Sequence, residues 1–250
     1  ADYIMANPPF NQKDWRAEDE LIDDPRWRGY DVPPKSNANY GWILNMVSKL
    51  SVNGVAGFIL ANGALSGGGE EYKIRRKLIE NDLVEAIVVL PRDMFYTTDI
   101  SVTLWILNKN KKERVVQIGD EERKYRNRKG EILFVDLRRW GTEYEKKYIE
   151  LMLDDISKIA QNYHNWQQDN YEDSYSNIPE YCHSAKLEDV ARNDFSLVPS
   201  KYIEFIDRDL ELDFDKEMKR IQEEFKELLK DEKQSQKELI EAFKGLGYEL

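Results

Sequence analysis

Residues 3–10 read Tyr-Ile-Met-Ala-Asn-Pro-Pro-Phe, and this stretch decides the fold. Its first four residues form a short apolar run, which is typical of a strand. Because proline has no backbone N–H to donate to a sheet, the strand must end at Asn7-Pro8-Pro9. In a parallel sheet such a turn lies at the carboxyl ends of the strands, where α/β folds place their ligands.

Downstream of the turn, apolar runs alternate with amphipathic stretches, the pattern of βα units that feed a parallel sheet. Apolar runs predict further strands over residues 55–61, 83–90, 101–107 and 132–135. Helical spacing predicts helices over residues 39–50, 70–81 and 143–166. The first four strands, starting with residues 3–6, are expected to be covered on both faces.

The Asn7-Pro8 pair offers two oxygen acceptors, the side-chain amide of Asn7 and the carbonyl of Pro8. Two acceptors that converge on one NH2 group keep its lone pair from delocalising, so the amine becomes nucleophilic without a strong base. Phe10 adds an aromatic face on which a planar base can stack. A strand-ending turn would also explain the prolines, and the tetrapeptide alone leaves both interpretations open.

Composition limits the possible classes of protein. The 250 residues are 34% charged and contain no apolar run long enough for a membrane span. The net charge of −11 argues against a general electrostatic nucleic-acid binder. A single cysteine, Cys182, and two histidines exclude a disulfide framework and make a metal site unexpected. Without a secretory signal pattern, the expected location is the cytoplasm.

Residues 105–139 carry eleven Lys and Arg against six Asp and Glu, and their pattern predicts a basic hairpin. One interpretation makes this segment the face that contacts DNA phosphates. The other makes it a solvated loop whose lysines protect an edge strand. The candidate phosphate contacts are Lys109, Lys111, Lys112, Arg126, Arg128 and Lys129.

The last forty residues have a different pattern. Apolar residues recur there with a 3,4 heptad spacing, and Glu232 and Ser235 interrupt them. This spacing fits a long helix that docks on another protein. It also fits an amphipathic helix that packs on its own domain. The expected organisation is residues 1–140 as a catalytic part, 141–210 as a helical and mixed segment, and 211–250 as an amphipathic helix.

Several segments accompany the Asn7 to Phe10 motif. They are Asn-Ala-Asn-Tyr-Gly-Trp at 37–42, Phe-Ile-Leu-Ala-Asn-Gly at 58–63, Leu-Pro at 90–91, Phe-Tyr-Thr-Thr at 95–98, Ile100, Leu-Trp at 104–105 and Glu-Ile-Leu-Phe-Val-Asp at 131–136. Together they resemble the modification subunit of type I restriction-modification systems, the adenine-N6 DNA methyltransferases. The resemblance implies an α/β fold, the C-terminal half of a Rossmann-like S-adenosylmethionine-dependent methyltransferase sheet followed by a mostly helical tail.

The resemblance also implies a reaction, methyl transfer from S-adenosylmethionine to N6 of an adenine rotated out of the duplex. Asn7, Pro8, Pro9 and Phe10 would be catalytic, and Phe95 or Tyr96 would pack on the base or simply pack under their loop. The residues Asn39, Tyr40, Asn62 and Gly63 are expected either to support the catalytic residues from behind or to be structural, with Gly63 in a turn. The implied partners are DNA, a specificity subunit and a restriction subunit.

The family's glycine-rich turn and ribose-binding acidic residue have no match here, and Ser66 to Gly69 suits a flexible loop better. The cofactor-binding residues are therefore expected upstream of Ala1, in an N-terminal half that would be a further partner. Without that half, the strand over residues 3–6 would be an exposed edge. Two alternatives stay open: a non-catalytic module for subunit assembly, and an N-methyltransferase of a protein glutamine.

Overall fold

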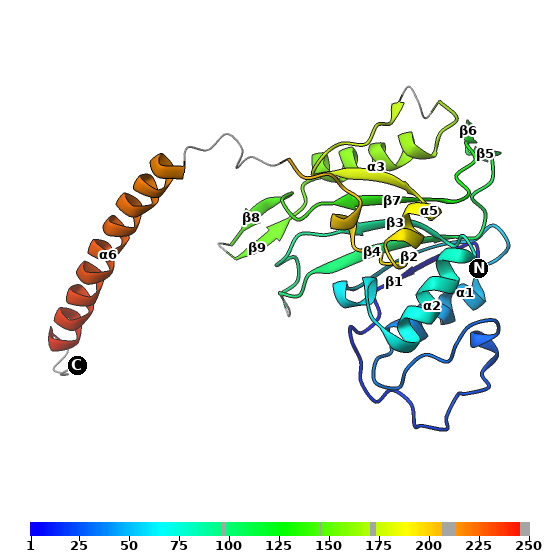
Figure 1. The fold of residues 1–250 in the computed structure, drawn as a ribbon, viewed down its shortest axis with the longest axis horizontal. Helices are drawn as coiled ribbons and strands as arrows, with labels where there is room; N and C mark the ends of the chain where they lie inside the picture. Colours follow the sequence, from blue (N-terminus) through cyan, green and yellow to red (C-terminus); the bar gives the residue numbers. More distant parts are fainter. Residues whose placement is uncertain (97–98, 146, 171–173, 207–213, 246–250) are drawn as a thin grey trace. The chain divides into compact units, whose positions relative to one another are not determined.

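The computed structural model describes residues 1–96, 99–145, 147–170, 174–206 and 214–245 (Figure 1). The chain divides into two units, Ala1–Phe205 and Ile206–Leu250. The expected boundary at residue 140 is not a structural boundary, because later elements complete the first unit. The helix α3 (Leu153–Gln167) packs on its sheet, and the strand β10 (Cys182–Lys186) pairs with it.

A six-stranded sheet forms the centre of the first unit, in the order β1-β2-β4-β3-β7-β10. The strands that precede β10 are β1 (Tyr3–Ala6), β2 (Val55–Ala61), β3 (Val84–Val89), β4 (Val102–Asn108) and β7 (Glu131–Asp136). Pairings show that β1, β2, β3 and β7 run in one direction, whereas β4 and β10 run in the other. The predicted α/β class with a mostly parallel sheet is therefore confirmed.

The chain returns from β3 as its antiparallel neighbour β4. A parallel crossover needs a dozen or more residues, usually with a helix, and no helix is described between β3 and β4. The reversal leaves two distinct ends. Asn7, Asn62 and Leu90 follow strands at the carboxyl end of the sheet. Lys109 follows β4 at the amino end, because Asn108 pairs with Val55 at the start of β2.

Helices cover the two faces of the sheet unequally (Figure 1). One face is covered by α1 (Asn39–Lys49), α2 (Gly69–Glu80) and the short α5 (Leu187–Arg192), and it holds the larger apolar core. The other face is covered by α3, whose Trp166 packs on β3 and β7. The strand β3 is buried on both faces, as predicted, but β1 is not, and its Met5 is 92% exposed.

Two hairpins leave the sheet at opposite ends (Figure 1). A hairpin is present within the predicted segment at the amino end, as β5 (Arg114–Ile118) and β6 (Glu121–Tyr125). Residues 114–125 carry three Lys and Arg against three Asp and Glu, so this hairpin is not itself basic. The second, β8 (Thr142–Tyr144) with β9 (Tyr148–Glu150), replaces the start of the helix predicted over residues 143–166. Glu145 adopts a positive φ of 51°, which makes a turn there, and α3 begins only at Leu153.

The second unit contains one long helix, α6 (Phe214–Gly245), as predicted. None of its described residues is buried, and its apolar residues Met218, Ile221, Phe225 and Leu228 are all exposed. No helix in the described ranges is both long enough and apolar enough to span a bilayer.

Candidate functional site

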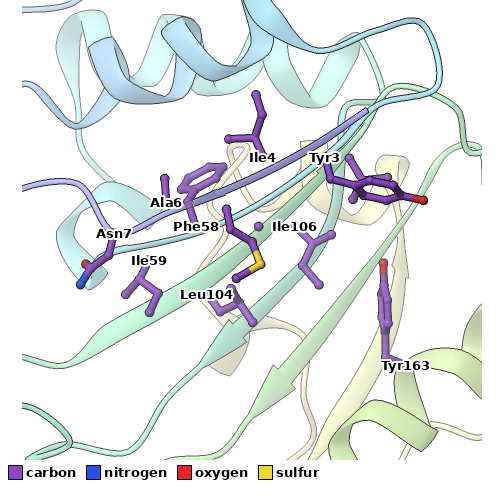
Figure 2. Close-up of a pocket in the computed structure, with 12 residues that line it drawn as sticks. Tyr3, Ile4, Ala6, Asn7, Phe58, Ile59, Leu104, Ile106 and Tyr163 are labelled. Atoms are coloured by element: carbon purple, nitrogen blue, oxygen red, sulfur yellow. The ribbon is translucent and has the colours of Figure 1, made fainter. Parts of the chain in front are cut away.

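The candidate site starts where β1 ends. Ala6 pairs with Phe58 of β2, and Asn7 then leaves the sheet with its side chain directed away from the strand (Figure 2). Asn7 and Pro9 are exposed, and Pro8 and Phe10 are half-buried. Among the described residues, no hydrogen bond engages the Asn7 amide or the Pro8 carbonyl, so both acceptor oxygens remain available to a substrate.

The turn that carries these acceptors is fixed to the start of α1. Asn11 adopts a positive φ of 51°, a conformation that asparagine tolerates better than most residues. Its backbone N–H donates to Asn39 Oδ1 at 3.1 Å, and Asn39 Nδ2 donates back to Asn11 Oδ1 at 2.9 Å. Asn39 is buried and structural, as expected, whereas Asn11 was not anticipated. Asparagine directly after the motif is the signal that could have identified it.

The second aromatic residue that is predicted to pack on a base, Phe95 or Tyr96, lies in the loop after β3. The Phe10 and Phe95 rings meet edge to face, with centroids 6.2 Å apart, although they lie far apart in the sequence. Tyr96 instead meets the ring of Tyr148 on β9, with centroids 4.8 Å apart. Of the two candidates for packing on a base, Phe95 is therefore the one beside Phe10.

Asn62, Tyr40 and Gly63 also lie at this end of the sheet, where the first two hydrogen-bond to neighbouring segments. Thr103 Oγ1 donates to Asn62 Oδ1 at 2.5 Å, which joins β4 to the turn after β2. The hydroxyl of Tyr40 donates to the carbonyl of Ala64 at 2.6 Å, and burial raises the pKa of this phenol well above its usual value. Gly63 lies in the short helix η2 (Asn62–Leu65). These contacts agree with the structural roles expected for Tyr40 and Asn62.

The predicted phosphate-binding cations lie at the opposite, amino end of the sheet. The seven residues of β2 separate the two ends by about 20 Å, at roughly 3.3 Å per residue. Lys109 Nζ donates to the carbonyl of Leu50 at 2.9 Å. Lys111 is buried, where its ammonium group pairs with Asp82 and also donates to the carbonyl of Glu131 at 2.7 Å.

Arg128 forms the centre of a buried ion pair. Its Nε lies 2.9 Å from Oε1 of Glu85, and both side chains are fully buried. Glu85 also accepts hydrogen bonds from Asn108 Nδ2 at 2.7 Å and from the Tyr163 hydroxyl at 3.0 Å. Burial, together with the charge of Glu85, raises the pKa of Tyr163 well above its ordinary value.

These pairings correct half of the predicted phosphate contacts. Arg126 Nη2 lies 2.7 Å from Glu131 Oε2, and Lys111 and Arg128 are likewise committed to carboxylates inside the protein. Burial lowers the pKa of Lys111 even beside Asp82, because desolvation of the ammonium group outweighs the ion pair. The phosphate-contact assignment is therefore wrong for these three residues. Lys112 and Lys129 remain exposed.

Two hollows flank the exposed strand β1. The larger, of 720 Å³, lies between β1, β2, β4 and Tyr163 (Figure 2). The smaller, of 440 Å³, lies between β1, Pro8, Pro9 and Trp42. Neither is lined by a carboxylate or a glycine-rich turn, so these walls do not fit the ribose and amino-acid parts of S-adenosylmethionine. Among the described residues there is also no cluster of three His, Cys, Asp or Glu that could hold a metal ion.

Comparisons with known proteins identify a family. Residues 1–210 match the family N-6 DNA Methylase. The chain is 39% identical to the type I restriction enzyme HindI methylase subunit of Haemophilus influenzae, covering 99% of this chain and 52% of that protein. It is 34% identical to the MjaIX methylase subunit of Methanocaldococcus jannaschii, covering 99% of this chain and 42% of that protein.

Solved structures point to the same family. The methyltransferase subunit of a type I restriction-modification system from Streptococcus thermophilus superposes with a TM-score of 0.67 at 27% identity, covering 82% of this chain and 38% of that one. The chain spans about half the length of the curated relatives that it matches. The predicted resemblance to type I modification subunits is confirmed, and the chain belongs to the N-6 DNA methylase family.

Proposed function

We propose that this chain carries the methyl-acceptor side of an adenine-N6 DNA methyltransferase of a type I restriction-modification system. The observation that carries the proposal is the arrangement at the carboxyl end of the sheet. There the Asn7 amide is exposed and free of hydrogen bonds within the described part of the chain, and Phe10, three residues later, meets the ring of Phe95.

In this mechanism the two acceptors hold the amine. Asn7 Oδ1 and the Pro8 carbonyl each accept one hydrogen of the adenine N6 group, which leaves the nitrogen lone pair free for attack. The base must first leave the duplex, because the amine is paired inside it. Phe10 and Phe95 then contact the extruded base. The Asn11–Asn39 hydrogen bonds keep the acceptor turn in place during these steps.

The cofactor that supplies the methyl group is S-adenosylmethionine. Because the walls around β1 do not fit its polar parts, we propose that protein outside these 250 residues provides those contacts. The exposed side chains of β1 and the two apolar hollows beside it are the surface on which such a segment would pair and pack. The N-terminal half expected from the resemblance is the proposed occupant.

The proposed macromolecular partners are DNA, a specificity subunit and a restriction subunit in the cytoplasm. The support for subunit docking is α6, whose apolar residues are exposed along its described length. Glu232 and Ser235 interrupt its heptad spacing and disfavour a self-paired coiled coil. This exposed stripe is also what favours the second candidate function, a module whose contribution is assembly.

Removing α6 tests the docking proposal. Each apolar residue buried on docking contributes about 1.5 to 3 kcal/mol, so cutting the chain after residue 213 is expected to abolish co-purification with the specificity subunit. The first unit should still fold, which circular dichroism checks. Equal recovery of the complex with and without α6 would overturn the docking role.

The product of the reaction tests the proposed function. The chain would be assembled with its N-terminal half and the specificity subunit and incubated with S-adenosylmethionine and either DNA or a glutamine peptide. Mass spectrometry would then identify the methylated nucleoside or peptide. The expected product is N6-methyladenine, which should be absent when the N-terminal half is omitted. Methylation of a glutamine peptide instead would favour the protein methyltransferase alternative. Assembly without any methylated product would favour the assembly module.

A further inference from the structure

Three tyrosines gather where the hairpin β8–β9 meets the loop after β3, and we call Tyr96, Tyr144 and Tyr148 the tyrosine cluster. Tyr96 and Tyr148 meet with centroids 4.8 Å apart and planes inclined by 73°. Tyr144 is the cross-strand partner of Tyr148. The exposed fractions are 71% for Tyr96 and 42% for Tyr144. Exposed aromatic rings that gather in one place, unlike single ones, are typical of binding surfaces.

The tyrosine cluster is joined to the acceptor site through a short stretch of chain. The backbone N–H of Ile149 donates to the carbonyl of Asp93 at 3.0 Å, which ties β9 to the loop after β3. Phe95, directly before Tyr96, meets Phe10 at 6.2 Å. A ligand on the tyrosine cluster would therefore lie beside the base held between Asn7 and Phe95.

Charge around the tyrosine cluster is mixed. Among the described residues, the cations are Arg92, exposed on the loop, and Lys147, whose Nζ lies 5.3 Å from the centroid of Tyr148. The acidic neighbours are Asp93, Glu143, Glu145 and Glu150. Such a surface does not attract a phosphate backbone strongly. It suits a flat, neutral ring, because stacking on an aromatic side chain works with any base and needs no net charge.

We propose that the tyrosine cluster is a stacking platform for a second DNA base, the neighbour of the extruded adenine on the same strand. Extruding the adenine removes one stacking partner from that neighbour, and the exposed ring of Tyr96 or Tyr144 replaces it. The inference rests on the proposed function, since it takes DNA as the substrate. Stacking of this kind would let a chain with a net charge of −11 contact DNA without a basic groove.

Binding of single-stranded DNA to the full chain tests the proposal. The probes are a short oligothymidylate and an abasic strand of equal length, which has the same phosphates but no bases. We expect the oligothymidylate to bind more tightly. Replacing both exposed rings, Tyr96→Ala with Tyr144→Ala, should weaken its binding about 10-fold, within the range measured for stacked bases. The double Phe variant keeps the rings and should bind like the wild type.

The control variant is Tyr3→Ala, which removes an exposed tyrosine at the amino end of β1. Equal binding of the two strands, or an equal loss with Tyr3→Ala, would overturn the proposal. In the assembled enzyme the double Ala variant should raise KM for DNA and leave kcat nearly unchanged, and an unchanged KM would contradict it. If the wild-type enzyme makes no methylated adenine, it is the proposed function that fails, whatever the oligothymidylate result.

Discussion

The two ends of the sheet use polar groups in opposite ways. At the carboxyl end, Asn7 is exposed and its amide has no hydrogen bond within the described residues. At the amino end, Arg128 and Glu85 are fully buried against each other. The basic composition of residues 105–139 suggested an available charged surface, but the structure uses much of that charge inside the protein. The two ends therefore differ in how many of their polar groups remain available, and not in the number of charges that the sequence supplies.

The reversal of β4 creates this difference. Because β4 runs against its neighbours, the segment that follows it begins at the amino end, next to the start of β3. There Lys111 meets Asp82 and Arg128 meets Glu85. A parallel β4 would have delivered the same segment to the carboxyl end, beside Asn7. The direction of one strand therefore decides which residues can share a site.

The largest expected effect concerns the buried pair. Replacing Arg128→Met leaves Glu85 buried without its cation, which should lower the free energy of unfolding by about 3 to 5 kcal/mol. Denaturant titration measures this change. The matched control, Lys129→Met, replaces an exposed cation nearby and should change the free energy by less than about 0.5 kcal/mol. Equal stability of the two variants would remove the distinction between structural and available cations.

A smaller effect is expected at the turn that carries the acceptors. Replacing Asn39→Ala removes both hydrogen bonds between Asn39 and Asn11, so the turn is held less firmly, by the remaining bonds from Asn37 to Asn11 and from Ala38 to Gln12. Single-turnover methyl transfer in the assembled enzyme should slow by about 10-fold, because small displacements of a positioned group are costly. Ser48→Ala on the exposed side of α1 serves as the control. A rate equal to that of the control would show that Asn39 does not position the turn.

The smallest effect is expected from the exposed cations of the amino end. We propose that Lys112 and Lys129 are the members of the basic segment that reach DNA phosphates. Replacing both with Gln should reduce the salt dependence of DNA binding by at most about two phosphate contacts, with kcat unchanged. An unchanged salt dependence would exclude the amino end from the DNA-contacting surface.

Much of the fold was predictable because its signals are local. The helix expected over residues 39–50 is α1, the helix expected over 70–81 is α2, and the prolines place Asn7 after a strand. The hairpin β8–β9 was missed because Tyr144, Tyr148 and Ile149 also fit a helical spacing. The burial of Arg128 has no local signal, since its partner Glu85 comes from another strand.

The candidate site was predictable to a similar extent. The motif itself indicates Asn7, Pro8 and Phe10, and the pairing of Phe10 with Phe95 needs the fold, because the two residues belong to different loops. The same contact favours Phe95 over Tyr96 as the ring beside Phe10. The sequence alone could not decide between them, because the two residues are adjacent. Asn11 was missed because its role depends on a backbone angle.

Asn7 is the central residue of the proposed chemistry. Replacing Asn7→Ala in the assembled enzyme removes one of the two acceptors for the target amine and should slow single-turnover methyl transfer by roughly 100-fold or more, while DNA affinity stays near that of the wild type. A rate within a few-fold of the wild type, in a variant that folds and binds DNA normally, would contradict the assignment of the chemistry to the carboxyl end of the sheet.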